Sequence, residues 1–540
     1  MTVFVPELLY VDRRFERGRV LVCDDLGRVV ATPRLEIPED FNGGENSFVE
    51  TEPGTVVRVG RVVRLPRRAL LPGLINAHSH AFQRVIRGRT EHRGARVEDS
   101  FWTWREEMYA AAARLTPEDI YDASRMAFLE MLTGGITSVG EFHYLHRTPE
   151  GREYEDPNLL AEQVVRAARS VGIRIALLRT AYARAGFRAE PDERQRRFIE
   201  PDAETYLRNT DALIRDLAPG ATKDEGHDGH EANARGGRVG SEARAGRVAD
   251  GFLAGAPPLP DAWVGVAPHS VRAVPREYLR ALSAFAGERG LPLHMHVAEQ
   301  PAEVAACVAE TGRTPVALLS EEGALGPNFT GVHAVHVTPE EVRALAAARA
   351  SVCACPTTER NLGDGVVPAD LLFAAGVPVA LGTDSHAQID LLEDARELEY
   401  HLRLKTLRRN VLAPSPEENT RDEGTRGEGA RDDAAPGMSA LAARLFECAS
   451  ASGARSIGAR AGSFEPGRAA DFFAVDLEDP SIAGASAEDL LPAVVFSLSR
   501  AGIREVFVGG RPVVEGGRAA AQEEIVSRFA ALQKRLWGRS

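Results

Sequence analysis

Short apolar runs alternate with amphipathic stretches over most of the chain. Eight of the apolar runs have the length and composition of β-strands: 70–78, 136–144, 173–182, 262–270, 291–299, 331–337, 350–356 and 378–385. Helical patterns follow most of them. In TPEDIYDASRMAFLEMLTGG and TPEEVRALAAARA, a threonine precedes an acidic residue by three positions, which predicts a capped helix start. Eight alternating strand–helix units predict an α/β fold with a (β/α)₈ TIM-like barrel.

The pattern differs at both ends of the chain. Residues 1–69 contain short segments typical of β-strands, such as RVLVCDDLGRVVATP. Residues 452–518 contain similar segments, such as REVFVGGRPVVEGGR. We therefore predict that these two segments form the N- and C-terminal parts of one small β domain. The barrel would occupy 70–451, and a C-terminal helix would lie within 519–540. A length of 540 residues also favours more than one domain.

Two segments inside the predicted barrel do not fit its pattern. Residues 218–260 and 412–437 are rich in glycine, arginine and acidic residues and poor in aliphatic ones. This composition predicts solvated or disordered insertions. The histidines of the first insertion, His227 and His230, are not expected to bind a ligand. A helix is predicted at 438–451, directly after the second insertion.

Composition limits the classes of partner. Hydrophobic residues make up 44% of the chain and the net charge is −13, which argues against nucleic acid or an anionic membrane as the main partner. The N-terminus lacks the pattern of a signal peptide, and no apolar run approaches the length of a membrane span. Cys353 and Cys355 lie in an apolar run and are interpreted as buried free thiols rather than metal ligands. We expect a cytoplasmic protein with a small-molecule substrate.

The sequence LLPGLINAHSH, residues 70–80, is an apolar strand that ends in His-x-His. Side chains two positions apart on a strand point to the same face, so His78 and His80 would present two imidazoles to one point. Active sites of (β/α)₈ barrels lie at the C-terminal ends of the strands. Further histidines and carboxylates are predicted at the same end of the barrel: His269, His294, His296, Glu299, His333 and Asp384.

Several imidazoles with one carboxylate suit a divalent metal, with Zn²⁺ preferred over Fe²⁺ or Mn²⁺. The spacing His296-x-x-Glu299 has a chemical meaning as well. A histidine at the strand end can bind the metal, while a carboxylic acid on the following loop can move protons between water and a leaving nitrogen.

Four motifs, PGLINAHSHAFQR, HMHVAEQ, GVHAVHV and LGTDSH, resemble the amidohydrolase superfamily in its mononuclear-metal deaminase branch. The C-terminal stretch from Ala470 to Arg518 resembles that family's β segment. Within the branch, the chain is most similar to the formimidoylglutamate deiminases through HSHAFQR, DSFWTWREEMY, TSVGEFHYLH, PHSVRAV, CPTTERNLGDG and DSHAQIDLLEDARELEY. The resemblance covers nearly the whole chain apart from the two insertions.

The resemblance implies roles for individual residues. The implied metal ligands are His78, His80, His296 and Asp384. The implied catalytic residues are Glu299, His333 and Asp384. The implied substrate-binding residues are Gln83, Arg105, Tyr144, His269 and Arg272, although Arg105 is equally consistent with a surface position. Trp102 and Trp104 are consistent either with a pocket wall or with core packing.

Two histidines and the lysines are left outside the implied metal site. His294 is expected to be buried and hydrogen-bonded, and His336 to face away from the site. Binuclear relatives bridge two metals through a carbamylated lysine on the fourth strand, but the lysines here, Lys223, Lys405 and Lys534, lie outside the predicted strands. One metal is therefore expected.

The implied reaction is hydrolysis of N-formimino-L-glutamate to N-formyl-L-glutamate and ammonia, a step of histidine degradation. Metal-activated water would attack the formimino carbon. The alternative is another mononuclear-zinc deaminase that acts on guanine, an adenosine derivative or a triazine, but such flat rings have no need of two carboxylate clamps. A barrel kept only as a binding protein is disfavoured because the full set of ligands and acids is present. Relatives in this branch commonly form homodimers.

Overall fold

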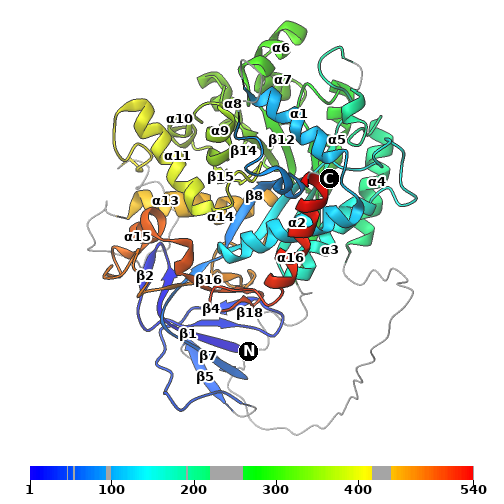
Figure 1. Ribbon diagram of the computed structural model, residues 1–540. Helices are drawn as coiled ribbons and strands as arrows, with labels where there is room; N and C mark the ends of the chain where they lie inside the picture. Colours follow the sequence, from blue (N-terminus) through cyan, green and yellow to red (C-terminus); the bar gives the residue numbers. More distant parts are fainter. Residues whose placement is uncertain are drawn as a thin grey trace.

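The computed structural model describes residues 1–44, 47–52, 55–92, 99–189, 192–218, 259–415 and 439–538. A parallel eight-stranded sheet lies at its centre, in the order β15-β14-β13-β12-β11-β10-β9-β8, and a bridge between Ser79 and Asp384 joins its two edges. The predicted (β/α)₈ barrel is confirmed (Figure 1). Its strands are β8 (Leu74–Ser79), β9 (Ile136–His143), β10 (Arg174–Ala181), β11 (Ala262–Pro268), β12 (Leu293–Val297), β13 (Phe329–His333), β14 (Ser351–Ala354) and β15 (Val379–Leu381).

Helices surround the barrel (Figure 1). Those in the first half of the chain are η1 (Ala81–Ile86), α1 (Phe101–Ala112), α2 (Pro117–Thr133), α3 (Leu159–Val171), η2 (Glu193–Gln195), α4 (Ala203–Asp216) and α5 (Arg276–Arg289). Those that follow are α6 (Pro301–Thr311), α7 (Pro315–Glu321), α8 (Pro339–Ala347), α9 (Pro356–Leu362), α10 (Ala369–Ala374), α11 (Leu391–Thr406), α13 (Ala440–Cys448), α14 (Ala451–Ile457), α15 (Leu490–Ser497), η4 (Arg500–Gly502) and α16 (Gln522–Trp537).

The two predicted helix starts have reciprocal caps. Before α2, the Thr116 side chain accepts a hydrogen bond from the Asp119 backbone N–H, and the Asp119 carboxylate accepts from the Thr116 N–H at 2.7 Å. Thr338 and Glu341 repeat the arrangement at the start of α8. Each cap satisfies backbone donors that the first turn leaves without a partner, so these short motifs define the helix starts without help from tertiary contacts.

The predicted helix at 438–451 is two helices in the structure, α13 and α14. The chain leaves the helical path at Ala449 and Ser450 because the Ala449 carbonyl accepts a hydrogen bond from Ile75 N–H on β8 at 2.8 Å. Gly453 then lets α14 approach the barrel, since a Cβ there would lie 2.6 Å from the Ile75 carbonyl oxygen. The interruption arises from contact with the barrel, which the helical periodicity of the segment does not indicate.

A second sheet combines both ends of the chain, as predicted for the small β domain. Its strand order is β18-β17-β16-β7-β1-β3-β4, with β2 paired to β1, and β5 and β6 form a separate pair. The N-terminal strands are β1 (Thr2–Val11), β2 (Arg14–Glu16), β3 (Leu21–Cys23), β4 (Val29–Ala31), β5 (Phe48–Glu52), β6 (Thr55–Arg58) and β7 (Arg61–Pro72). The C-terminal strands are β16 (Phe472–Asp476), β17 (Ile503–Val508) and β18 (Arg511–Val514).

The predicted strand 70–78 is divided between two sheets, so the prediction that the whole run forms one barrel strand was wrong. Residues up to Pro72 belong to β7 of the small domain, and the barrel strand β8 begins at Leu74. Gly73 lies between them and donates its N–H to the Asp471 carbonyl at 2.9 Å. A Cβ at this position would lie 2.1 Å from Thr137 Oγ1, so the change of direction requires glycine.

Several barrel strands end earlier than predicted. The run 291–299 ends as a strand at Val297, 331–337 at His333, and 378–385 at Leu381. The backbone adopts left-handed φ angles beside these ends, 52° at Ala298, 70° at His333 and 42° at Asp384. Non-glycine residues rarely occupy this region, and such strain concentrates at functional sites. The turns carry side chains across the mouth of the barrel.

An ion pair connects the barrel to the small β domain. Arg174, the first residue of β10, donates from Nε and Nη2 to the two carboxylate oxygens of Asp471 at 2.8 and 3.3 Å. The Gly509 N–H donates to the same carboxylate at 2.6 Å. Asp471 is buried, so its charge depends on these donors for stabilisation.

Asp471→Ala is expected to lower the free energy of unfolding by about 3–5 kcal/mol, because it leaves the Arg174 charge unpaired at the interface. Urea denaturation measures the loss. Asp261→Ala is the matched control: Asp261 pairs with Arg169 at the surface, where removal of a partner costs about 0–1 kcal/mol. Equal losses in the two variants would contradict the structural role of the buried pair.

The C-terminal helix α16 lies against α2 (Figure 1). Arg528 donates from Nε to Asp122 Oδ1 at 2.8 Å, and Arg125 donates to Glu524 at 2.8 Å. The two predicted insertions, 218–260 and 412–437, lie mostly outside the described residues, and His227 and His230 lie wholly outside them. Within the described parts of the chain, every helix is too short or too polar to cross a membrane.

Candidate metal centre and active site

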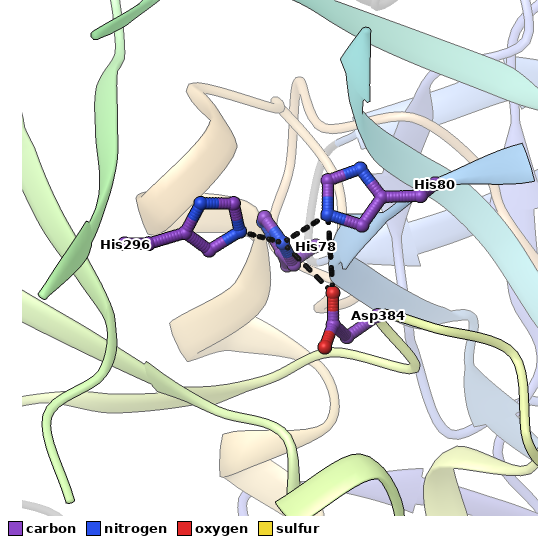
Figure 2. A group of neighbouring side chains, drawn as sticks. All are labelled: His78, His80, His296 and Asp384. Atoms are coloured by element: carbon purple, nitrogen blue, oxygen red, sulfur yellow. Dashed lines mark hydrogen bonds and ion pairs between the residues drawn. The ribbon is translucent and has the colours of Figure 1, made fainter. Parts of the chain in front are cut away.

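Four of the residues that the sequence singled out as metal ligands meet at one point (Figure 2). The side chain of His78 lies in the middle of the group. Its Nε2 lies 3.2 Å from His80 Nε2, 3.1 Å from His296 Nε2 and 3.2 Å from Asp384 Oδ1. His80 Nε2 is also 3.1 Å from Asp384 Oδ1. Three separate strand ends, those of β8, β12 and β15, bring these atoms together.

The hydrogen bonds of His80 and His296 place a proton on the outer nitrogen of each ring. His80 Nδ1 lies 2.8 Å from the Phe142 carbonyl oxygen, and His296 Nδ1 lies 3.1 Å from the His269 carbonyl oxygen. Since only an N–H can donate to a carbonyl, each of these rings holds a proton on Nδ1, which leaves Nε2 to bind a cation through its lone pair. Lone pairs that face one another at about 3 Å repel unless a cation lies between them. This arrangement is typical of metal-bound histidines.

The protonation states also suit a divalent cation. Burial lowers the pKa of His78 to about 3 and lowers that of His296 well below its ordinary value, so both rings are neutral at pH 7. Burial raises the Asp384 pKa, but the imidazoles of His78 and His80 beside it outweigh burial and hold it well below its usual range. Three imidazoles and one carboxylate are ligand types that Zn²⁺ prefers, and their ligand atoms lie within 4.8 Å of one another.

Glu299 and His333 lie beside the four ligands. His333 Nε2 is 3.7 Å from Glu299 Oε1 and 3.9 Å from Asp384 Oδ2. Burial raises the pKa of Glu299 to about 7, which is the range in which a carboxyl group can both hold and release a proton at neutral pH. Burial lowers the His333 pKa, but the carboxylates of Glu299 and Glu359 outweigh it and raise the pKa well above its ordinary value.

Glu359 is a residue of this site that the sequence analysis missed. Its Oε1 lies 3.3 Å from His333 Nδ1 and accepts the Cys355 backbone N–H at 2.8 Å. Glu359 therefore fixes the ring of His333 from the side opposite the metal cluster. It lies on α9, within the motif CPTTERNLGDG, where nothing in the local pattern distinguishes it from an acidic residue of a helix surface. Cys355 and Cys353 are buried free thiols, as predicted.

The five residues predicted to bind substrate line one pocket together with the metal cluster. They are Gln83, Arg105, Tyr144, His269 and Arg272. Gln83 donates from Nε2 to Tyr144 Oη at 2.8 Å, and burial raises the Tyr144 pKa well above its ordinary value, so this phenol keeps its proton. The pocket also contains residues that were not predicted, among them Phe101, Met108, Tyr109, Tyr182 and Leu362.

Arg272 is the least satisfied charge of the pocket. Arg272 is only 9% exposed, and its Nε and Nη1 atoms are buried without a hydrogen-bond partner. Buried N–H donors without an acceptor cost free energy, which a bound carboxylate would recover. Arg105 also lines the pocket, with its Nε buried and without a partner, and its Cζ lies 4.5 Å from the Trp102 ring. Trp104 forms part of the pocket wall, while Trp102 is 36% exposed.

The two histidines that were set aside lie away from the cluster. His294 is fully buried, and its Nε2 lies 2.9 Å from the Ser456 carbonyl oxygen. His336 Nε2 lies 2.8 Å from the Asp364 carbonyl oxygen, outside the residues that line the pocket. Each ring is engaged with a backbone acceptor, which accounts for its presence without a ligand.

Comparison with known proteins gives results that agree with this geometry. Residues 69–513 match the model of the Amidohydrolase family. The chain is 37% identical over 462 residues to formimidoylglutamate deiminase of Pseudomonas aeruginosa, which covers 85% of this chain and 88% of that protein.

Solved structures show the same fold over nearly the full length. An amidohydrolase from Brucella melitensis is 28% identical and superposes with a TM-score of 0.78 over 99% of this chain and 100% of that one. Atrazine chlorohydrolase from Arthrobacter aurescens, solved in complex with zinc, is 21% identical with a TM-score of 0.70, over 99% of this chain and 100% of that one.

Proposed function

This chain belongs to the amidohydrolase family and is a hydrolase of C–N bonds, and on that basis we propose that it deiminates N-formimino-L-glutamate. The products are N-formyl-L-glutamate and ammonia. The observation that carries the proposal is that Arg272 has two buried nitrogens without a hydrogen-bond partner, in a pocket lined by three of the four proposed metal ligands, His80, His296 and Asp384. The similarity to a relative named for this substrate supports the same choice.

The charge of the pocket distinguishes this substrate from a flat ring. Arg272 and Arg105 both have a buried nitrogen without a partner, and both line the pocket. N-formimino-L-glutamate has two carboxylates, which can accept from these donors. A neutral purine or triazine would leave the buried guanidinium of Arg272 uncompensated, and that costs binding free energy.

The metal proposed for the cluster is one divalent ion, Zn²⁺, held by His78, His80, His296 and Asp384. An ion bound there supplies Lewis acidity that lowers the pKa of water to about 7. The zinc in the structure of atrazine chlorohydrolase supports this choice of metal. The described barrel strands contain no lysine that could bridge a second metal.

Two side chains of the protein, those of Asp384 and Glu299, accept and donate the protons of the reaction. Asp384 contributes Oδ1 to the cluster, and its Oδ2 lies on the side of His333, where it can accept a proton from the attacking water. As the oxygen of water adds to the formimino carbon, Glu299 donates a proton to the terminal nitrogen, which becomes an amine. When the C–N bond breaks, the proton held by Asp384 passes to this amine, which leaves as ammonia, and the hydroxyl proton of the intermediate passes to Glu299. A pKa of about 7 lets Glu299 begin this step protonated and recover its proton afterwards.

His333 and His269 orient the reacting groups. His333 holds a proton on Nδ1 toward Glu359 and presents Nε2 to the side where oxygen becomes negative in the tetrahedral intermediate, so it can donate to that oxygen. His269 lines the pocket, and its Nδ1 lies 3.1 Å from Ser270 Oγ, which limits rotation of the ring beside the substrate.

The test is ammonia release by zinc-loaded protein, with N-formimino-L-glutamate, guanine and adenosine as parallel substrates. We expect turnover of the first alone, which would support a step of histidine degradation. Activity only on a ring would retain the hydrolase but refute the proposed substrate. Absence of ammonia with all three substrates, from protein that contains zinc, would refute it as well.

Arg272→Ala is expected to raise KM for N-formimino-L-glutamate by about 10- to 100-fold with little change in kcat, since a hydrogen bond to a charged group contributes about 1.5–3 kcal/mol. Steady-state kinetics measures both constants. Arg276→Ala is the control, because Arg276 is exposed, pairs with Glu321 and Glu322 and does not line the pocket. An unchanged KM in Arg272→Ala would show that this arginine does not hold a carboxylate.

A further inference from the structure

We propose that Gln195 is a positioning residue that sets the hydroxyl groups of Tyr109 and Tyr182 as hydrogen-bond donors to a substrate carboxylate bound at Arg272. The inference rests on the proposed function, which supplies a substrate with carboxylates. It adds a second group of donors to the pocket, made of side chains from α1, the loop after β10 and η2. Tyr109 ends the motif DSFWTWREEMY, but the sequence analysis assigned a role to none of the three residues.

The geometry around Gln195 is that of one donor group shared by two phenols. Gln195 ends η2 and is 1% exposed. Its Nε2 lies 2.8 Å from Tyr109 Oη and 2.9 Å from Tyr182 Oη. Its Oε1 accepts the Asp192 backbone N–H at 3.4 Å, which fixes the orientation of the amide. A carboxamide nitrogen has two N–H groups, so each phenol oxygen accepts one of them.

This arrangement leaves both phenol hydrogens for another acceptor. Each oxygen uses a lone pair on Gln195, so neither phenol can donate its O–H to the amide nitrogen. The two oxygens are 3.5 Å apart, longer than the 2.5–3.0 Å of an ordinary O–H···O hydrogen bond. Burial raises the pKa of Tyr182 well above its ordinary value, which keeps this phenol protonated. Both tyrosines line the pocket, so the open acceptor position is there.

The arginines in the same part of the pocket have N–H donors without an acceptor, although the carboxylates of Glu303 and Glu299 help to raise the Arg272 pKa. Arg272 is 9% exposed, and its Nε and Nη1 are buried without a partner. The Arg105 Cζ lies 5.5 Å from the Tyr109 ring centroid, and Arg105 Nε also lacks a partner. Two guanidinium groups and two phenol hydrogens thus border one space. An ionised carboxylate has about four acceptor positions and no donor, so it fits this set.

A buried arginine holds Gln195 and Tyr109 in this relation. Arg197, two residues after Gln195, is 1% exposed and donates from Nη1 to the Leu115 carbonyl at 2.8 Å and to the Ala112 carbonyl. Ala112 is the last residue of α1, the helix that carries Tyr109, and Leu115 lies in the connection that follows it. The η2 segment is therefore fixed to α1 by the fold itself.

The test is Gln195→Glu, which keeps the side-chain shape but replaces the NH2 group, with its two N–H donors, by a second acceptor oxygen. The new carboxylate would take the two phenol hydrogens and add a negative charge near the substrate. We expect KM for N-formimino-L-glutamate to rise at least about 10-fold with kcat changed by less than about 3-fold. Binding of the product, N-formyl-L-glutamate, should weaken by a similar factor in titration calorimetry. Gln163→Glu, the same change on the surface of α3, should alter neither.

A double variant separates hydroxyl orientation from added charge. With Tyr109→Phe and Tyr182→Phe in place there is no O–H to turn, so Gln195→Glu should then raise KM by a smaller factor than in the parent enzyme. An equal factor in both backgrounds would overturn the proposal. So would an unchanged KM with a lowered kcat or melting temperature, which is the result of a structural role alone.

The binding measurement also distinguishes this inference from the proposed reaction. Protein that binds N-formyl-L-glutamate and loses that affinity in Gln195→Glu, but releases no ammonia, would support the donor group and refute the reaction. Protein that binds no dicarboxylate, with zinc present, would overturn both.

Discussion

Glu299→Gln is expected to lower kcat by about 10²- to 10⁴-fold while the protein keeps its full content of metal, the range by which general acid–base groups accelerate reactions. Glutamine has the same shape but cannot transfer a proton, so the nitrogen would have to leave without help. Glu299 is outside the cluster of four ligands, which is why the metal should remain. Single-turnover ammonia release and elemental analysis of the same sample measure the two quantities.

The control for this variant is Glu277→Gln on the outer face of α5, which removes the same charge far from the pocket. It should retain the parent kcat and metal content. Near-parent kcat in Glu299→Gln would contradict the proton-transfer role. Loss of metal in that variant would show instead that the Glu299 carboxylate is needed for metal binding.

His296→Ala is expected to abolish measurable turnover and to leave the protein with far less than one metal ion per chain. The change removes one of the four clustered side chains, so the other three offer an ion fewer ligand atoms. Added Zn²⁺ should raise the melting temperature of the metal-free parent protein, because the metal binds the folded state, but should have little effect on the variant.

Two histidine variants test the specificity of that result. His294 lies on the same strand as His296. The variant His294→Ala should keep metal, although loss of the buried hydrogen bond to Ser456 should reduce stability. His401→Ala changes a histidine that pairs with Glu397 on α11, and it should change neither property. Full metal content in His296→Ala would refute the ligand set.

Sequence alone determined the features that depend on local spacing. Thr116 and Thr338 define helix starts because a capping box is satisfied within four residues. The His-x-His pair at 78 and 80 shares a face because side chains alternate along a strand. Strand–helix alternation then places every strand end at one rim, so the convergence of His78, His296 and Asp384 could be predicted without coordinates.

Only the tertiary structure decided which residues that are far apart in the sequence contact one another. Gly73 divides an apolar run between two sheets because Thr137, more than sixty residues later, occupies the space that a Cβ would need. Glu359 and Gln195 act through partners that are distant in the sequence, His333 and the two tyrosines. Neither belongs to a pattern of fixed spacing, since a hydrogen bond between distant elements depends on how the barrel brings them together. Local chemistry therefore specified the barrel and the cluster of His78, His80, His296 and Asp384, and packing selected the residues that contact this cluster and its pocket.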